Sequence, residues 1–120
     1  MAKALSVISA IFPAGESLSE VAVLGVTGNT VVGIAMPTAS WIKAVVTLQG
    51  SPDGVNFYDL YDGVTGQELS FNVVPHTMVM INPNRMRCCQ AVILRSGTRA
   101  APVPQTSGVR IFGIVVEASA

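Results

Sequence analysis

The sequence predicts an all-β protein: a single-domain antiparallel β-sandwich of about eight or nine short strands, with the jelly roll as one form of it. No long segment repeats apolar residues at the helical spacing of i, i+3, i+4 and i+7. Val, Ile, Thr and aromatic residues instead occur in short runs, and Gly, Pro, Asn and Asp separate these runs. The length of 120 residues suits one domain, so we treat residues 1–120 as one sandwich. Within it, residues 1–20 are a candidate extended arm or edge strand for assembly.

Nine runs have the composition of strands, and turn-forming residues bound them. The expected strands are Leu5–Phe12, Glu20–Val26, Thr30–Met36, Trp41–Gln49, Phe57–Tyr61, Leu69–Val73, Thr77–Ile81, Cys88–Arg95 and Val109–Glu117. After the first strand the segment FPAGES predicts a turn, and TGN at 27–29 has the Gly-Asn signal of a hairpin. SPDG at 51–54 fits a type I turn, with Pro at its second position and Gly at its fourth. NPN at 82–84 and SGT at 96–98 supply further turns, and residues 99–108 form a loop without periodicity.

The segment WIKAVVTLQ, residues 41–49, alternates most clearly between an apolar and a polar face. The apolar face, which we expect to pack in the core, consists of Ile42, Ala44, Val46 and Leu48. The polar face, which we expect to meet solvent, consists of Lys43, Thr47 and Gln49. Trp41 lies on the same side at the start of the strand, where its ring would cover a sheet end or meet a neighbouring molecule. This strand predicts a sheet with one dry side and one wet side.

Two other segments are apolar on both faces, and the whole chain is poor in charge. Only 12% of the residues are charged, against about 25% in an ordinary soluble domain, and the mean hydropathy is +0.54. Apolar side chains point to both sides in residues 21–36 and 109–116, so a lone monomer would expose an apolar patch. We therefore expect these segments at contacts with neighbouring subunits or another protein. The apolar interface candidates are Val31, Ile34, Met36, Trp41, Ile111 and Val115.

Charge patterning narrows the kinds of partner. Seven Lys and Arg balance seven Asp and Glu, so no basic excess favours nucleic acid, and we predict no such partner. Arg95 and Arg99 are further interface candidates, since they would pair with acids of a neighbouring subunit; solvated strand ends are an equally compatible interpretation. Polar residues interrupt the best candidate for a membrane span, at 21–36, so we predict no membrane partner. The first 15 residues have only a short, interrupted apolar run, and we expect no cleaved signal peptide.

No group of residues in the sequence indicates catalysis or metal binding, and we predict no enzyme, no cofactor and no metal site. His76 is the only His, lies between two expected strands, and no Gly-x-Ser-x-Gly motif accompanies it. Cys88 and Cys89 are adjacent, so they would point to opposite faces of a strand and stay unbonded to each other. At least one of these thiols is expected to pack as a small apolar group. Zinc needs about four ligands, which one His and two Cys do not supply.

All three Asp residues of the chain lie in SPDGVNFYDLYDG, residues 51–63. An EF-hand loop needs ligands at alternating positions and a Glu at the twelfth, and this stretch has neither. We expect two strand pieces and two turns instead, with one Asp-Gly pair in each turn. Because strict alternation would put Asp59 on the same face as Phe57, a bulge or a strand end is expected near them. A cation site at these acids is the alternative interpretation.

Two blocks of the sequence share a pattern with a known group of proteins. The first block, ASWIKAVVTLQGSPDGVNFYDLYDG, has a Trp, then Leu-x-x-Ser-x-Asp-Gly-x-x-Phe, then Leu-Tyr. The second block, LRSGTRAAPVPQ, has Arg-Ser-Gly-Thr followed by Pro-Val-x-Gln. The matching positions are Trp41, Leu48, Ser51, Asp53, Gly54, Phe57, Leu60, Tyr61, Arg95, Ser96, Gly97, Thr98, Pro102, Val103 and Gln105. With this pattern, the segment 39–116 resembles small structural proteins of tailed-bacteriophage virions, which belong with the capsid and head genes.

The resemblance implies a β-sandwich that binds the outside of a phage head as a decoration or cement protein. It implies the major capsid protein as a partner, a dimeric or trimeric homo-oligomer, and a place on the capsid surface of a virion made in the bacterial host cytoplasm. The matching residues would serve the fold and assembly rather than catalysis. A head–tail or tail structural component is a close alternative. A carbohydrate-binding β-sandwich, with Trp41, Tyr58 and Tyr61 as an aromatic platform, is a further one.

Overall fold

The structure is a computed structural model that describes residues 5–24, 29–37, 41–42, 44–82, 86, 89–106 and 108–118. The described residues form nine β-strands and no helix, which confirms the predicted all-β class. The strands are β1 (Leu5–Phe12), β2 (Ala22–Val23), β3 (Asn29–Ala35), β4 (Val45–Ser51), β5 (Tyr58–Asp59), β6 (Ser70–Asn72), β7 (Met78–Met80), β8 (Ala91–Ser96) and β9 (Arg110–Ala118). Within this part of the chain, no helix is available that could cross a membrane.

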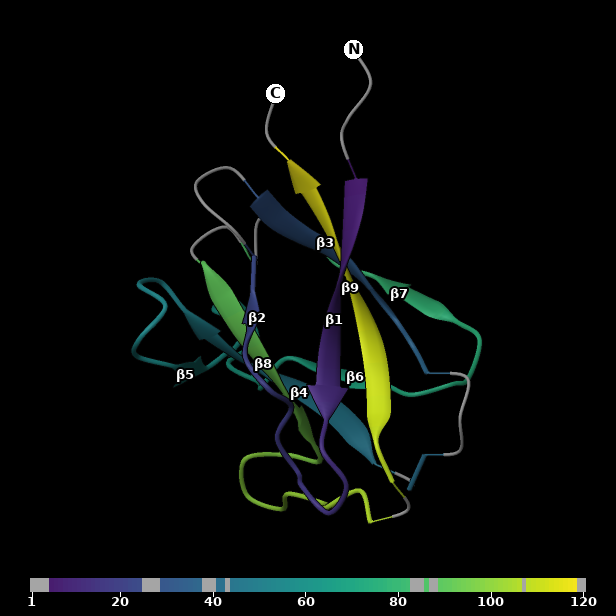
Figure 1. The fold of residues 1–120 in the computed structure, drawn as a ribbon. Coiled ribbons are helices and arrows are strands. Elements are labelled where there is room, and N and C mark those ends of the chain that lie inside the picture. Colours follow the sequence, from purple (N-terminus) through teal and green to yellow (C-terminus); the bar gives the residue numbers. More distant parts are fainter. Residues whose placement is uncertain are drawn as a thin grey trace.

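The strands form two antiparallel sheets that pack face to face as a sandwich (Figure 1). The four-stranded sheet has the order β1-β9-β3-β7. The five-stranded sheet has the order β2-β8-β4-β5, and β6 also pairs with β4. The chain therefore changes sheets at each step from β1 to β4 and again from β6 to β9. This interleaved strand order is that of a jelly roll, the form considered from the sequence.

The strand bounds differ most from the prediction at β4, which begins at Val45 instead of Trp41. A side chain, not a strand, holds the backbone of Ile42 just before β4. The Ile42 N–H donates to Oε1 of Gln105 at 2.8 Å, and the Ile42 carbonyl accepts from Nε2 of Gln105 at 3.0 Å. Because Gln105 is itself buried, its amide takes the place of a neighbouring strand at this end of the sheet.

The core lies between the two sheets and is built from alternate residues of the longer strands. Its largest fully buried apolar side chains are Phe12, Phe112, Leu24, Ile34, Leu48, Met86, Leu94 and Ile114. At one end of the core, Trp41 packs edge-on against Phe12 and Phe112, with ring centroids 5.4 and 5.0 Å away. Trp41 therefore covers this end of the sandwich, one of the two places expected for its ring, although it packs against the core and not on the solvent side of a strand.

A β-bulge in β3 explains why residues 29–36 are apolar on both sides. The register between β3 and β9 shifts between Val31 and Gly33. An extra residue reverses the phase of side-chain alternation, so Val31 before the bulge and Ile34 and Met36 after it all point into the core. The prediction that these three residues lie at an interface is wrong, because their side chains are buried within the protomer.

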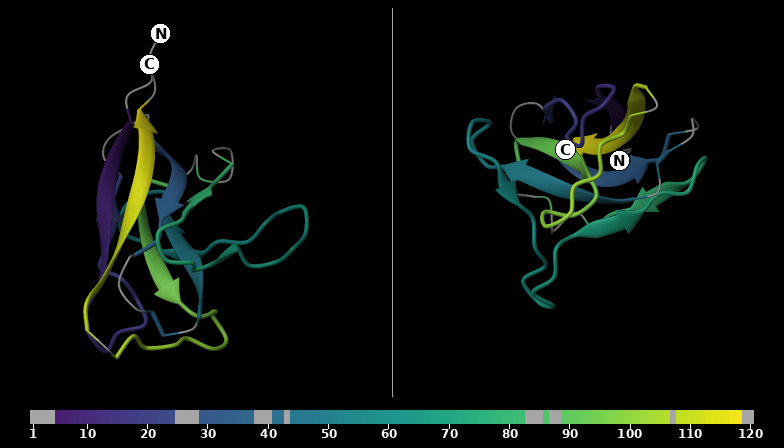
Figure 2. Two further views of the ribbon diagram at one scale, coloured as in Figure 1. Left: turned by 90° about the vertical axis from the view of Figure 1, so that its right-hand side faces the viewer. Right: turned by 90° about the horizontal axis from the view of Figure 1, so that it is seen from below.

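Residues 57–70 leave the five-stranded sheet as a hairpin, which we call the outer hairpin. Tyr61 pairs with Glu68 across it in an isolated bridge. Val64 at the tip is 94% exposed. Both views in Figure 2 show the tip, in teal, projecting from the body of the sandwich. The base of the outer hairpin contacts the side of the five-stranded sheet that faces away from the core.

Candidate functional site

The outer face of the four-stranded sheet is apolar across its whole width. Cross-strand pairing places its outward side chains in rows, and all four strands contribute. One row consists of Val7, Val115, Gly33 and Met80. The next row consists of Ser9, Gly113, Ala35 and Met78, and β1 and β9 add the pair Ile11 and Ile111. We call this set of residues the apolar face.

Side chains around the apolar face stand open to solvent. Val7 is 66% exposed, Ile111 is 53% exposed and Met80 is 71% exposed. The side chain of Val7 lies against Gly113, because a Cβ atom on Gly113 would come within 3.0 Å of Cγ1 of Val7. Soluble monomers rarely leave a large contiguous apolar patch in water, so this face is the candidate for contact with another protein.

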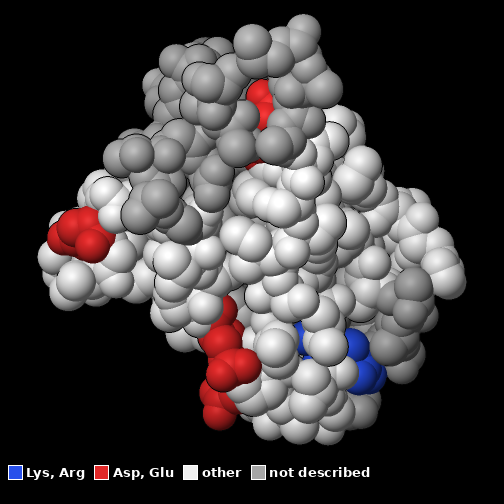
Figure 3. Space-filling view, turned by 45° about the horizontal axis from the view of Figure 1, so that its top comes forward, with Lys and Arg blue, Asp and Glu red and all other residues white. Residues whose placement is uncertain are grey.

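The residues of the apolar face carry no charge. Glu117 lies at the end of the same ladder, opposite Leu5 on β1 and Thr30 on β3, and marks the border of the face. On the side of the molecule drawn in Figure 3, charged side chains form a few small groups with a broad uncharged area between them. A partner of the apolar face would therefore be recognised by shape and apolar contact.

Two predicted interface residues lie on this face. Ile111 is exposed, and Val115 is half-buried near the centre of the sheet. Val7 and the two Met residues of β7 were not among the predicted interface residues. The signal for Val7 was present, because β1 is apolar on both sides in the same way as β9. β7 has only three residues, too few to show which side of the strand faces water.

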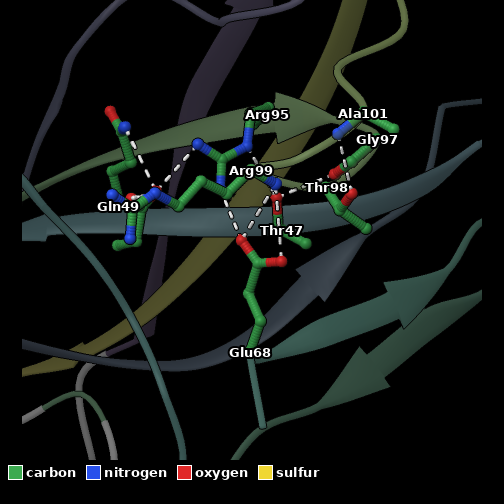
Figure 4. A network of polar contacts seen from close by, with 9 residues as sticks. Thr47, Gln49, Glu68, Arg95, Gly97, Thr98, Arg99 and Ala101 are labelled. Atoms are coloured by element: carbon green, nitrogen blue, oxygen red, sulfur yellow. Dashed lines mark hydrogen bonds and ion pairs between the residues drawn. The ribbon is translucent and has the colours of Figure 1, made fainter.

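On the outer face of the five-stranded sheet, polar side chains are buried beneath the outer hairpin (Figure 4). Arg95 of β8 is 6% exposed and lies at the centre. Its Nη1 is 2.8 Å from Oδ1 of Asp59, and its Nη2 contacts Oε2 of Glu68. Its Nε donates to Oγ1 of Thr47 at 3.1 Å, and this hydroxyl donates to the Gly97 carbonyl at 2.8 Å. We call Thr47, Asp59, Glu68 and Arg95 the Arg95 cluster.

Arg99 and Gln49 border the Arg95 cluster. The side chain of Arg99 is 68% exposed, and its Nε lies 3.4 Å from Oδ2 of Asp59. Nε2 of Gln49 lies 3.4 Å from Oδ1 of the same carboxylate. Burial raises the pKa of Asp59, but hydrogen bonds from Arg95 and Gln49 and the charges of both Arg residues outweigh it and lower the pKa. Asp59 is therefore ionised at neutral pH.

The Arg95 cluster is a structural clamp. Asp59 lies on the outgoing side of the outer hairpin and Glu68 on the returning side, so Arg95 ties both sides to β8. Its charge is fully used within the protomer, which makes the prediction of Arg95 as an interface residue wrong. The expectation that Thr47 meets solvent is also wrong. Alternation along β4 put Thr47 on the outer side correctly, but it could not show that a later segment covers that side.

The acidic stretch at 51–63 forms the two predicted turns, but instead of two strand pieces it has the short strand β5 and an isolated bridge at Tyr61. The carboxylate of Asp53 accepts backbone hydrogen bonds from Asn56 and Val55, both at 2.8 Å, and these bonds hold its pKa well below the usual range. Asp62 accepts backbone hydrogen bonds in the second turn. In the described part of the chain, no three His, Cys, Asp or Glu side chains are grouped so that they could hold a metal ion.

A pocket of about 620 Å³ lies beside Trp41, near the start of β4. Its lining consists of Trp41, Ala44, Val45, Asn72, Val73 and Pro75. The indole Nε1 donates to the Ala44 carbonyl at 3.1 Å. Tyr58 pairs with Gly50, six residues further along the chain than Ala44, which is about 20 Å at 3.3 Å per residue. Trp41 and Tyr58 therefore do not belong to one aromatic platform.

The structure describes the one His of the chain and one of its two Cys residues. His76 is exposed in the turn before β7 and has a φ of 64°. Cys89 is buried in the core cluster, which confirms that a thiol packs as a small apolar group. Cys88 lies outside the described residues.

Comparisons with protein-family models, with curated proteins and with solved structures find no match for this chain. The likeness to phage virion proteins therefore rests on the two sequence blocks alone. Within the fold, several positions of these blocks hold the framework together: Arg95 in the clamp, Gln105 against Ile42, and Asp53 in its turn. The class that the structure defines is a β-sandwich of jelly-roll order with one exposed apolar face.

Proposed function

We propose that this protein is a non-enzymatic structural protein of a phage virion, a decoration protein that binds the outside of the head and stabilises the shell. Its partner is the major capsid protein, and its place is the capsid surface of a particle made in the bacterial cytoplasm. The observation that carries the proposal is the apolar face, which is uncharged, spans four strands and has exposed apolar side chains on β1, β7 and β9. The two sequence blocks support the same class of protein.

Burial of the apolar face supplies the binding energy in this proposal. Each Å² of apolar area removed from water contributes about 25 cal/mol, so a few hundred Å² contributes several kcal/mol before the costs of association. A single contact of this size is weak. An oligomer that bridges neighbouring capsid subunits makes several such contacts at once and gains avidity.

The first test counts copies of the protein in purified particles by quantitative mass spectrometry. A decoration protein is expected at a copy number comparable with that of the major capsid protein. A single ring of copies would favour the head–tail or tail alternative. Absence of the protein from intact particles would contradict the proposal.

The second test asks whether the apolar face is the contact. Ile111→Asp and Met80→Asp place a charge on exposed positions of this face, so the core stays intact. We expect each change to lower the occupancy of particles that lack the protein by at least about tenfold, the equivalent of 1.4 kcal/mol. Val64→Asp, at the tip of the outer hairpin, is the matched control and should bind normally. Normal occupancy by both face variants would exclude this face as the contact.

A further inference from the structure

β1 is an unusually unprotected sheet edge. It has eight residues, whereas the other strands at sheet edges in the described chain, β2, β5, β6 and β7, have two or three. Proteins protect their edges from pairing with other chains by short strands, charges, Pro or bulges. The β1 sequence LSVISAIF contains no charge and no Pro, and its pairing with β9 runs without a register shift.

The backbone groups of β1 divide between β9 and the open edge. In an antiparallel strand, the N–H and C=O of one residue point to the same side, and the side alternates along the chain. The Ile11 carbonyl accepts a hydrogen bond from the N–H of Glu20, which lies outside the ladder with β9. The backbone N–H and C=O of Ile11 therefore point away from β9. Leu5, Val7 and Ser9 have the same phase as Ile11 and therefore direct their backbone groups to the open edge.

The hydrogen bonds of β3, on the other side of β9, lead to the same assignment of the β1 backbone groups. In β3 the Val32 carbonyl accepts from the N–H of Ile81, and the Met36 N–H donates to the carbonyl of Thr77. The backbone groups of the even-numbered residues of β3 therefore point toward β7 and the residues next to it. After the bulge, the odd-numbered residues of β3 consequently bond to odd-numbered residues of β9. The even-numbered residues of β9 therefore bond to the even-numbered residues of β1 that lie opposite them. The odd-numbered residues of β1 direct their backbone groups to the open edge.

We propose that β1 pairs antiparallel with β1 of a second copy, across a two-fold axis at Val7, so that two four-stranded sheets join into one. Val7 then lies opposite Val7 of the partner subunit, and Leu5 lies opposite Ser9 of the partner subunit. Each such pair makes two hydrogen bonds, which uses the N–H and C=O of Leu5, Val7 and Ser9 in both copies. A register shifted by one pair toward Ile11 would compete with Glu20 for the Ile11 carbonyl.

A second copy fits this edge better than an unrelated chain. The antiparallel pairing of a strand with its own copy has a two-fold axis, so the same backbone groups serve both copies, which is the condition for a two-fold contact. β1 has no charge, so no like charges meet at the axis. The pairing also brings the two apolar faces together as one continuous surface. The inference does not rest on the proposed function, because it concerns the sheet edge and the capsid contact concerns the sheet face.

The oligomeric state tests the pairing directly. Light scattering and sedimentation of the full chain, over about 1 to 100 µM, should show a dimer. Val7→Pro removes the N–H at the axis, which has no partner among the described residues, and an edge position of this kind tolerates Pro. We expect Val7→Pro to be monomeric and Val7→Thr, which keeps the N–H, to remain dimeric. A wild-type monomer over the whole range, or a Val7→Pro dimer as tight as the wild type, would overturn the proposal.

Cysteine cross-linking tests the register and remains decisive if Val7→Pro fails to fold. Cα atoms in a hydrogen-bonded pair are about 5.5 Å apart, within the reach of a disulfide. Val7→Cys should therefore form a covalent dimer on mild oxidation, beyond any seen for the wild type with its own Cys residues. Ser9→Cys places its two thiols about 13 Å apart along the strands and should not cross-link alone, but should do so when mixed with Leu5→Cys. Equal cross-linking of Ser9→Cys and Val7→Cys would show that the register is wrong.

Discussion

The outer faces of the two sheets differ in what covers them. On the five-stranded sheet, the outer hairpin covers polar side chains, and Arg95 is paired with Asp59 and Glu68 inside the protomer. On the four-stranded sheet, apolar side chains such as Ile111 and Met80 are exposed, and the charged Glu117 lies only at the border of the apolar face. The protein thus buries charge on one side and exposes apolar surface on the other, the reverse of an ordinary soluble domain.

This difference indicates separate roles for the two faces. The covered face is complete within one chain, because the buried charges already have partners at hydrogen-bond distance. The apolar face is incomplete, because its apolar area stabilises the protein only when another molecule removes it from water. Substitutions on the covered face should therefore affect folding, and substitutions on the apolar face should affect assembly.

The largest effect is expected where the sequence pattern was misinterpreted, in β3. Ile34 is 1% exposed, so Ile34→Asp places an unpaired charge in the core at a cost of several kcal/mol, comparable with the whole stability of a small domain. Ile111→Asp on the exposed face should change the free energy of unfolding by about 1 kcal/mol or less. Urea denaturation followed by circular dichroism measures both variants. A cooperatively folded Ile34→Asp protein would contradict the buried position given to Ile34.

The next largest effect is expected in the clamp. Arg95→Ala leaves two acids near each other under the outer hairpin without their cation, and removal of one partner from a buried pair costs about 3 to 5 kcal/mol. Arg99→Ala is the matched control, since its side chain is mostly exposed and such pairs contribute about 0 to 1 kcal/mol. Denaturation of both variants should rank Arg95 well above Arg99. Equal losses would mean that the Arg95 cluster does not hold the hairpin.

Strand positions could be predicted from the sequence because they depend on neighbouring residues. Gly54, with a φ of 81°, relieves the turn that SPDG indicated, and Leu5–Phe12 has the predicted bounds. The bulge in β3 was not visible in the sequence, since one extra residue in a pairing has no signature in the strand that carries it. Interface predictions for Val31, Ile34 and Met36 failed for this reason.

The cover over the five-stranded sheet was not predictable either. Thr47 and Arg95 are 48 positions apart in the sequence and bond to each other in the folded sheet, where Arg95 also contacts the outer hairpin. Their polarity indicated a solvent-facing side, because alternation reports which side a residue faces but not what lies there. Ile111 is exposed, as an interface residue needs to be, since β9 contains no bulge in its pairing with β1 and keeps its alternation along the strand; its place at an interface stays a prediction.

The smallest effect concerns the pH dependence of the clamp. The pKa of Asp59 is lowered in the folded protein, while an unfolded Asp titrates near 3.9. The unfolded state therefore binds the proton more readily, so the stability from this group is present above about pH 5 and is lost as the pH falls through the folded pKa. Asp59→Asn removes this proton linkage as well as part of the clamp. We expect the variant to be less stable than the wild type at pH 6, with a smaller further loss between pH 5 and pH 3.

The slope of stability against pH, not its absolute value, is the readout for Asp59. Urea denaturation at several pH values gives the slope for both proteins. Asp53 also has a lowered pKa, caused by the backbone N–H groups of its own turn, and stays in place in both proteins, so its contribution cancels in the comparison. Identical slopes for the wild type and Asp59→Asn would mean that Arg95 does not lower the pKa of Asp59, and that the covered face is held by packing instead of by charge.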